Sequence, residues 1–225
     1  MISVSLIDRC LIKNDHDRLL RELARNGLVI PLPLRVRLAS APTAAKALGL
    51  RRLSELTYSP TPQARRLAQQ LLDAQHPLGS FLPDPKDRST PAQPCPLTTA
   101  TVLAALQRVA QDLRDDSMQQ PLQQARRLGT QALARMQHAD GLFTEPTDRT
   151  IEDRQLTSAF IAYLLATDAL FRESIDFWSL AKHFDGSTSG MAPETAQLWA
   201  MAQLSETPTL RSPASAKEAL QLAAA

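Results

Sequence analysis

An internal repeat constrains the fold of this chain more than any other feature of its sequence. Residues 64–81 and residues 125–143 both contain Ala-Arg-Arg-Leu, then Gln-His, then Gly-x-Phe, in the same order. The match continues beyond the phenylalanine, where Pro-Lys-Asp-Arg-Ser at 85–89 corresponds to Pro-Thr-Asp-Arg-Thr at 146–150. So many matches at an offset of about 60 residues predict a repeated structural unit.

Each copy contains two helical patterns separated by a Pro-rich loop. Residues 64–75 and 125–137 place alanine and leucine on one helical face and arginine and glutamine on the other, which is typical of an amphipathic helix. Residues 97–106 and 156–166 are apolar nearly all round, which indicates a helix surrounded by protein. Each copy is therefore predicted to be a hairpin of one half-exposed outer helix and one buried inner helix.

Weaker copies of the same pattern flank the two clear ones. We therefore expect an all-α fold, an α/α-hairpin arc or partial α/α toroid of about four hairpins, over residues 16–204. The hairpins are expected at about 16–50, 63–108, 122–170 and 173–204. Residues 1–15 are expected to form an N-terminal arm, and residues 205–225 a linker and C-terminal tail.

The end of each outer helix carries a motif with a known counterpart. Gln75-x-x-x-Gly79-x-Phe81 recurs as Gln137-x-x-x-Gly141-x-Phe143. This pattern resembles the QW motif of the α/α-toroid superfamily, which includes terpenoid cyclases, protein prenyltransferase β subunits and several polysaccharide lyases, with Phe here in place of Trp. The resemblance covers roughly residues 60–204 and implies that each glutamine bonds the backbone of the neighbouring hairpin. A glycine just past the helix end is expected to adopt a left-handed conformation.

The chemistry of the superfamily is not matched by this sequence. The class II cyclases carry an Asp-x-Asp-Asp acid, whereas Asp-Leu-Arg-Asp-Asp at 112–116 has a different spacing. The prenyltransferases hold zinc through an Asp-x-Cys before an inner helix, but here Gln93 stands where that aspartate would precede Cys95. We therefore expect no metal site and no cofactor.

The corresponding loops carry the most interesting polar residues. Loops on a rigid scaffold commonly hold binding residues, and paired arginines there can clamp a carboxylate, sulfate or phosphate. A carboxylate beside an arginine can serve as a base, whereas the structural alternative is that each Asp caps a turn and each Arg ties its loop to the next hairpin. The catalytic candidates are Asp87, Asp148 and Glu152. The ligand-binding candidates are Arg88, Arg149, Asp87, Asp148, His76 and His138.

Both histidines among these candidates occupy corresponding positions after an outer helix. A metal site would need two or three of them to converge within a few ångströms. Equivalent positions in neighbouring hairpins lie at least a helix-packing distance apart. Packing at the helix C-terminus, where a cationic side chain is favourable, is therefore the preferred interpretation of His76 and His138.

The composition of the chain excludes or disfavours several other classes of protein. The chain has 225 residues, of which 44% are hydrophobic and 21% charged, which suits a packed core rather than a disordered chain. Two cysteines exclude a disulfide scaffold. A formal charge of +2 is small for a general nucleic-acid binder. No apolar run is long enough for a membrane span and the first residues lack a basic leader, so we expect a soluble, cytoplasmic protein.

Three functional classes remain open at this point. We expect a non-catalytic ligand-binding or assembly module whose partner is an unknown small molecule or protein, with a homodimer as one form of assembly. The alternative is a toroid-type enzyme, cyclase-like, prenyltransferase-like or lyase-like, that uses the aspartates and arginines of the loops. A further alternative is an Arg-rich binder of RNA or of an acidic protein, which the balance of 25 basic against 23 acidic residues disfavours.

Overall fold

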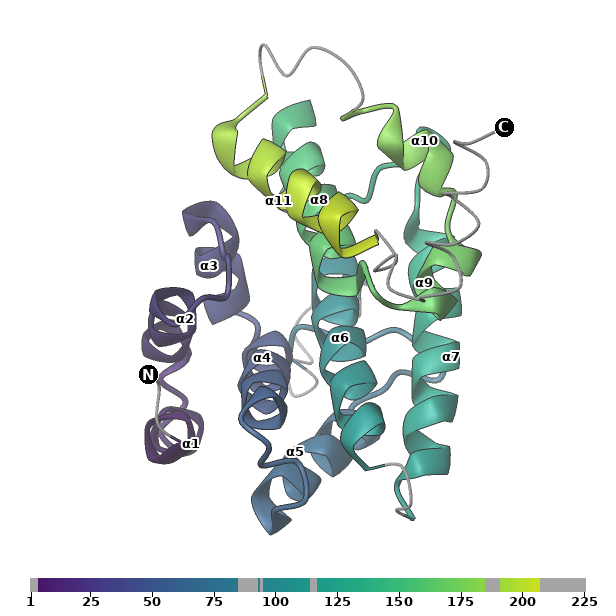
Figure 1. Cartoon of the computed structure of the whole chain (residues 1–225). Helices are drawn as coiled ribbons and strands as arrows, with labels where there is room; N and C mark the ends of the chain where they lie inside the picture. The colour runs from purple at the N-terminus through teal and green to yellow at the C-terminus, as the bar shows by residue number, and fades with distance from the viewer. Residues whose placement is uncertain (1–3, 85–92, 94, 114–116, 185–190, 207–225) are drawn as a thin grey trace, which may run out of the picture.

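The computed structural model of the chain describes residues 4–84, 93, 95–113, 117–184 and 191–206. These residues form eleven α-helices and one isolated antiparallel bridge between Gln75 and Phe81, so the predicted all-α class is confirmed (Figure 1). In chain order the helices are α1 (Val4–Ile12), α2 (His16–Arg25), α3 (Leu32–Ala39), α4 (Pro42–Glu55), α5 (Pro62–Asp73), α6 (Pro96–Asp112), α7 (Gln119–Met136), α8 (Ile151–Leu165), α9 (Ala169–Ser174), α10 (Phe177–Ala181) and α11 (Pro193–Glu206).

A row of four helices forms the centre of the molecule. Helix α4 packs against α6, α6 packs against α8, and α8 packs against α11. Every residue of α6 from Pro96 to Gln107 is buried, and α8 is buried from Leu156 to Leu165 except at Tyr163. The sequence lacks a polar face in these segments because protein surrounds each helix on all sides.

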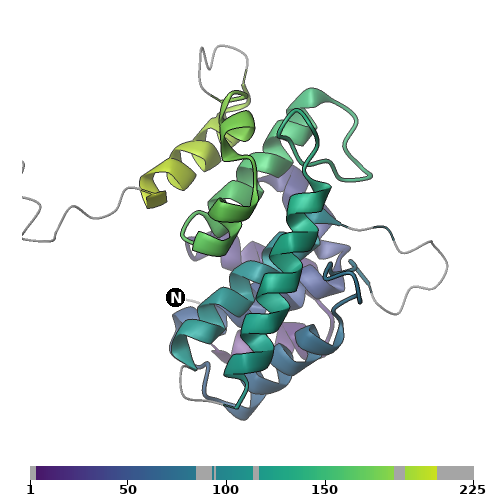
Figure 2. The same cartoon turned by 90° about the vertical axis from the view of Figure 1, so that its right-hand side faces the viewer.

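The outer helices of the two clear repeats are amphipathic, as predicted. Helix α5 buries Ala64, Leu67, Ala68 and Leu71 and contacts α4, α6 and α7. Helix α7 packs along α6 and lies in front of it in Figure 2. Most arginines and glutamines between these apolar positions face outward, whereas Arg126 of α7 is largely buried in an ion pair with Asp168. Each outer helix thus covers the inner row with one stripe of its surface.

The glutamine of each repeat joins its hairpin to the next one. Gln75 Nε2 donates to the carbonyl of Ala125 in α7 at 2.9 Å. Gln137 Nε2 donates to the carbonyl of Asp176 at 3.0 Å, and its Oε1 accepts from the Asp176 N–H at 2.8 Å. The predicted backbone bonds of both glutamines to the segment that follows in the chain are confirmed, whereas the pairing of outer and inner helices into hairpins stays a prediction.

A glycine turn follows each of these glutamines. Gly79 and Gly141 have φ of 93° and 90°, the left-handed region that glycine adopts without strain. Each donates its N–H to the carbonyl of the preceding histidine, at 2.7 Å to His76 and 2.8 Å to His138. The left-handed glycine predicted after each outer helix is therefore present in both copies.

The phenylalanine of each motif is fixed by its own inner helix. The Phe81 N–H donates to Thr99 Oγ1 at 3.1 Å, and the Phe143 N–H donates to Ser158 Oγ at 2.9 Å. Both rings are fully buried. The two copies thus share their hydrogen bonds as well as their sequence.

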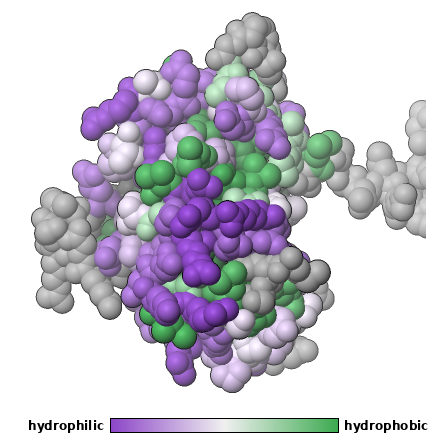
Figure 3. Space-filling view, turned by 90° about the vertical axis from the view of Figure 1, so that its left-hand side faces the viewer, coloured by the Kyte–Doolittle hydropathy of each residue, from purple (hydrophilic) through white to green (hydrophobic). Residues whose placement is uncertain are grey.

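The N-terminal helices cover one side of the central row. Helix α1 buries Ile7, Cys10 and Leu11 against α2 and α4, so one face of this helix belongs to the packed core. Helix α2 ends at a left-handed Gly27 with φ of 101°. The face formed by α1, α2 and α3 shows a hydrophilic band with hydrophobic patches on either side of it (Figure 3).

Helix α3 was not expected between the two predicted helices of the first hairpin. Pro31 precedes the helix and Pro33 lies in its first turn, where a proline costs nothing because that N–H has no helical partner. Leu34 and Leu38 are fully buried, one turn apart. The two prolines that suggested a loop therefore begin a helix.

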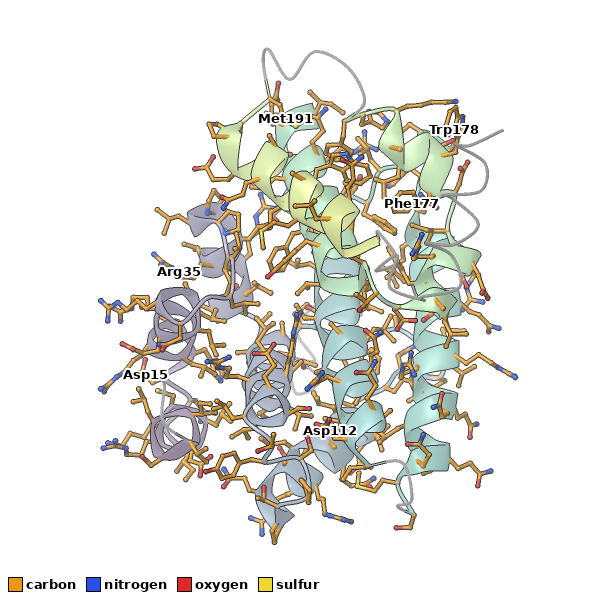
Figure 4. The ribbon with its side chains drawn as sticks, viewed as in Figure 1. Asp15, Arg35, Asp112, Phe177, Trp178 and Met191 are labelled. Carbon is orange, nitrogen blue, oxygen red and sulfur yellow. The ribbon has the colours of Figure 1, made fainter. Side chains whose placement is uncertain are left out.

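The remaining polar and aromatic contacts fix the two ends of the row. Asp112 at the end of α6 accepts hydrogen bonds from the buried hydroxyls of Ser54 and Ser59, the latter at 2.6 Å (Figure 4). At the other end Trp199 of α11 stacks on Phe177 and Phe184, with ring centroids 5.6 and 4.4 Å apart.

Among the described residues no helix is both long enough and apolar enough to cross a membrane.

Candidate functional site

The loops of the two repeats meet at one pocket beside the end of α3. Its volume is about 490 Å³. The first loop contributes residues 82–84, 93 and 95, the second contributes residues 145–147, and α3 with the residues after it contributes 37, 38, 40 and 41. The lining residues are Arg37, Leu38, Ser40, Ala41, Leu82, Pro83, Asp84, Gln93, Cys95, Leu97, Thr98, Glu145, Pro146 and Thr147.

Arg37 connects α3 to the second loop. Its guanidinium forms an ion pair with Asp148 and lies 3.4 Å from an oxygen of Asp153, and it also donates to Thr157 Oγ1 at 3.3 Å. The side chain of Arg37 is 18% exposed and that of Asp148 is 1% exposed. A largely buried pair of this kind needs further hydrogen bonds to offset the loss of solvent.

Asp148 receives those further hydrogen bonds and uses them to hold its loop. One oxygen accepts from Thr157 Oγ1 at 3.3 Å, and the other accepts from the backbone N–H of Glu145 at 2.8 Å. Asp148 therefore fixes the turn that begins at Glu145. This contact matches the structural alternative for the Asp-Arg motif, in which the aspartate caps a turn.

Glu145 is a buried carboxyl at the beginning of α6. Its Oε1 accepts from the backbone N–H of Leu97 at 2.6 Å, and the residue is 6% exposed. Positive N–H groups at a helix N-terminus attract a carboxylate. Loss of solvent outweighs this attraction, so burial raises the pKa of Glu145 above its ordinary value.

The thiol of Cys95 lies against this carboxyl. Its Sγ is 3.1 and 3.3 Å from the two carboxyl oxygens of Glu145 and 3.0 Å from Thr98 Oγ1. Burial, followed by the negative charge of Glu145, raises the pKa of Cys95 well above its ordinary value. The protonated thiol is a donor to Glu145, and it is not an activated nucleophile because nucleophilic attack needs the thiolate.

The predicted candidates are not all brought together. Asp148 does not line the pocket but contacts two residues that do, Arg37 and Glu145. Arg149 and Glu152 are exposed at the beginning of α8 and do not line the pocket. Asp87 and Arg88 lie outside the described residues.

The two candidate histidines lie apart from this pocket as well. His138 is exposed, and His76 Nδ1 accepts from the N–H of Leu78 at 3.2 Å. Within the described part of the chain no group of three or more His, Cys, Asp or Glu side chains is arranged to hold a metal ion.

Sequence reasoning missed Arg37 and Glu145 and considered Cys95 only as a zinc ligand. One signal was available in the repeat itself. Asp84 and Glu145 both precede the matched prolines of their loops, and both line the pocket. A recurring acid at this place points to the pocket, whereas Arg37 on the unexpected α3 has no counterpart in the repeat.

Comparison of the chain with protein-family models, with curated proteins and with solved structures finds no match. The resemblance to the α/α-toroid superfamily therefore stays a prediction that rests on the glutamine motifs.

Proposed function

We propose that the chain is a non-catalytic binding module whose pocket between α3 and the two repeat loops receives a small molecule with a protonated amine. The buried carboxyl of Glu145 carries this proposal. Burial raises the pKa of Glu145, so its carboxylate form is less favourable than that of an exposed glutamate. A ligand ammonium group would reverse that cost by pairing with the carboxylate.

The charges of the lining residues favour a cation. Asp84 and Glu145 are acids, whereas the single base, Arg37, already forms its ion pair with Asp148. Apolar side chains form much of the remaining wall, including Leu38, Leu82 and Leu97. An amine with an apolar body of moderate size matches both properties, and a volume of about 490 Å³ lies in the range of small-molecule sites.

The absence of an activated group supports a binding role over the enzyme alternative. Cys95 holds its proton, and Asp148 is committed to Arg37 and to the turn at Glu145. A nucleophile needs a lowered pKa or an adjacent free base. The pKa of Cys95 is raised instead, and the neighbouring Glu145 carboxyl already accepts from the N–H of Leu97.

Three probes of similar shape and different charge test the proposal by calorimetry. Protonated benzylamine is expected to bind, benzyl alcohol to bind more weakly, and benzoate to bind least, because only the first pairs with Glu145. The Glu145→Gln variant should remove the difference between benzylamine and benzyl alcohol. Glu152→Gln, an exposed acid on α8, is the matched control and should leave the order unchanged.

Proton release gives a second readout of the same event. Below the raised pKa of Glu145, binding of the ammonium group should expel the carboxyl proton, so the measured enthalpy should depend on the ionisation enthalpy of the buffer. Equal binding of the three probes, or an unchanged preference in Glu145→Gln, would contradict the proposal.

A further inference from the structure

A second, smaller cavity lies between α2, α4 and α8, away from the residues that line the first pocket. Its volume is about 110 Å³. Two consecutive arginines of α4, Arg51 and Arg52, line it together with Glu55, and Tyr163 of α8 closes one side. The end of α2 supplies the remaining wall through Leu23 and residues 26–28.

One carboxylate serves both arginines. Glu55 Oε1 accepts from Arg51 Nε at 3.1 Å, and Glu55 Oε2 accepts from Arg52 Nη1 at 2.9 Å. Two guanidinium groups and one carboxylate leave an excess of one positive charge at the cavity. The side chains of both arginines are only about one-fifth exposed, at 21% and 22%, so water screens this charge less than it would at the surface.

Both guanidinium groups also have a buried nitrogen without a hydrogen-bond partner. These nitrogens are Arg51 Nη1 and Arg52 Nε. A buried N–H of a charged group is costly when nothing accepts from it. Each guanidinium has five donors in a planar fork, and this geometry matches the oxygens of a phosphate group.

The end of α2 does not supply the missing acceptors. The carbonyls of Glu22, Leu23 and Ala24 accept from backbone N–H groups of residues 26–28, so the last turn is closed within its own segment. The Asn26 side chain also donates to the Glu22 carbonyl, at 2.8 Å. The acidic side chain in the last turns of α2, Glu22, forms an ion pair with Arg25 at 2.8 Å.

We propose that Arg51, Arg52 and the Tyr163 hydroxyl form a binding site for a phosphate group, either free or as the monoester of a small molecule. The excess positive charge and the two nitrogens without partners call for an anion with several acceptor oxygens. A cavity of about 110 Å³ has room for roughly three to four water molecules at about 30 Å³ each, which suits one such anion.

Titration calorimetry at constant ionic strength tests the site with two probes, inorganic phosphate and phenyl phosphate. Arg51→Gln and Arg52→Gln should each weaken binding by roughly tenfold, because each removes a charge-assisted hydrogen bond. Arg66→Gln is the matched control, since Arg66 is exposed on α5 and does not line the cavity. Circular dichroism verifies that each variant is folded.

A variant that is expected to tighten phosphate binding keeps the test decisive if an arginine variant fails to fold. Glu55→Gln removes the competing carboxylate and should tighten phosphate binding, whereas loss of a purely structural ion pair would leave affinity unchanged. Equal affinity for both probes identifies the free anion as the ligand, and tighter binding of phenyl phosphate identifies a phosphomonoester. No binding of either probe, or equal binding by Arg51→Gln, Arg52→Gln and Arg66→Gln, would overturn the proposal.

Discussion

The two clear repeats share their inter-hairpin hydrogen bonds but begin their inner helices differently. Helix α8 is capped within its own loop, where the N–H of Asp153 donates to Thr150 Oγ1 and the Asp153 carboxylate accepts from the N–H of Thr150. Helix α6 begins at Pro96, and the Cys95 Sγ before it accepts from the N–H of Thr98 at 3.4 Å. In addition, Glu145 from the loop of the other repeat accepts from the N–H of Leu97 in the same turn.

This difference explains where the pocket lies. Helix α8 takes its capping acid, Asp153, from its own first turn, and the other oxygen of Asp153 lies 3.4 Å from Arg37 of α3. A helix that receives an acid from a residue 48 positions away draws two loops together and encloses space between them. The shared hydrogen bonds build the scaffold, and the unequal helix beginnings create the candidate site.

The largest expected effect tests the turns that both repeats share. A Cβ atom at Gly79 would lie 2.3 Å from the Leu128 carbonyl oxygen, and one at Gly141 would lie 2.4 Å from the Ser179 carbonyl carbon. Gly79→Ala and Gly141→Ala should each lower the free energy of unfolding by about 3 kcal/mol or more, because backbone must move in addition to the left-handed strain.

Gly27→Ala is the matched control for these turns. Gly27 has the same left-handed sign of φ, but a Cβ there meets nothing within 4 Å. Its loss should be about 1–2 kcal/mol, the cost of the backbone conformation alone. Urea denaturation measures the free energy of unfolding of all three variants. Equal losses would show that the close packing of Gly79 and Gly141 adds nothing to the cost of the substitution.

The next largest effect tests the glutamine joints. Gln75→Ala and Gln137→Ala each remove at least two hydrogen bonds and should cost about 2 kcal/mol, at about 1 kcal/mol for each bond. Gln69→Ala, on the exposed face of α5, should change the free energy of unfolding by less than about 0.5 kcal/mol. A loss at Gln69 equal to that at Gln75 would show that the joint has no special role.

Glu145, the acid of the second loop that caps helix α6 of the first repeat, should make the free energy of unfolding depend on pH. Because burial raises the pKa of Glu145 in the folded state, the folded chain binds this proton more tightly than the unfolded chain. Stability from this group is therefore fully present below the ordinary pKa of glutamate and is lost as pH rises through the raised pKa.

The matched variant isolates this contribution. The free energy of unfolding of the wild type minus that of Glu145→Gln should decrease over this pH range, by at most about 1.4 kcal/mol per pH unit. Chemical denaturation at a series of pH values measures it. A difference that stays constant or increases with pH would show that folding does not raise the pKa of Glu145.

The smallest effect tests the helix that caps itself. Thr150→Ala removes the side chain that accepts from the N–H of Asp153 and should cost about 1 kcal/mol. Thr150→Ser keeps the acceptor and should restore most of this loss. Because Thr150 does not line the pocket, Thr150→Ala should leave binding of protonated benzylamine nearly unchanged, and a large loss of binding would show that the two helix beginnings are coupled.

The scaffold was largely predictable from the sequence, and the site was not. The apolar inner helices, the amphipathic outer helices and the glutamine contacts all follow from local periodicity and from the repeat. Helix α3 was missed because Pro31 and Pro33 also suit a loop. Glu145 was missed because its partners Cys95 and Leu97 are 50 and 48 positions away, so only folding brings them together.

The acceptors of the glutamine joints have a consequence for how such a chain can change. Gln75 and Gln137 both donate to main-chain carbonyls, those of Ala125 and Asp176, and every amino acid supplies the same carbonyl. The joint thus places no requirement on the side chain of the hairpin that follows. A substitution at position 125 or 176 would therefore leave the acceptor of the joint in place.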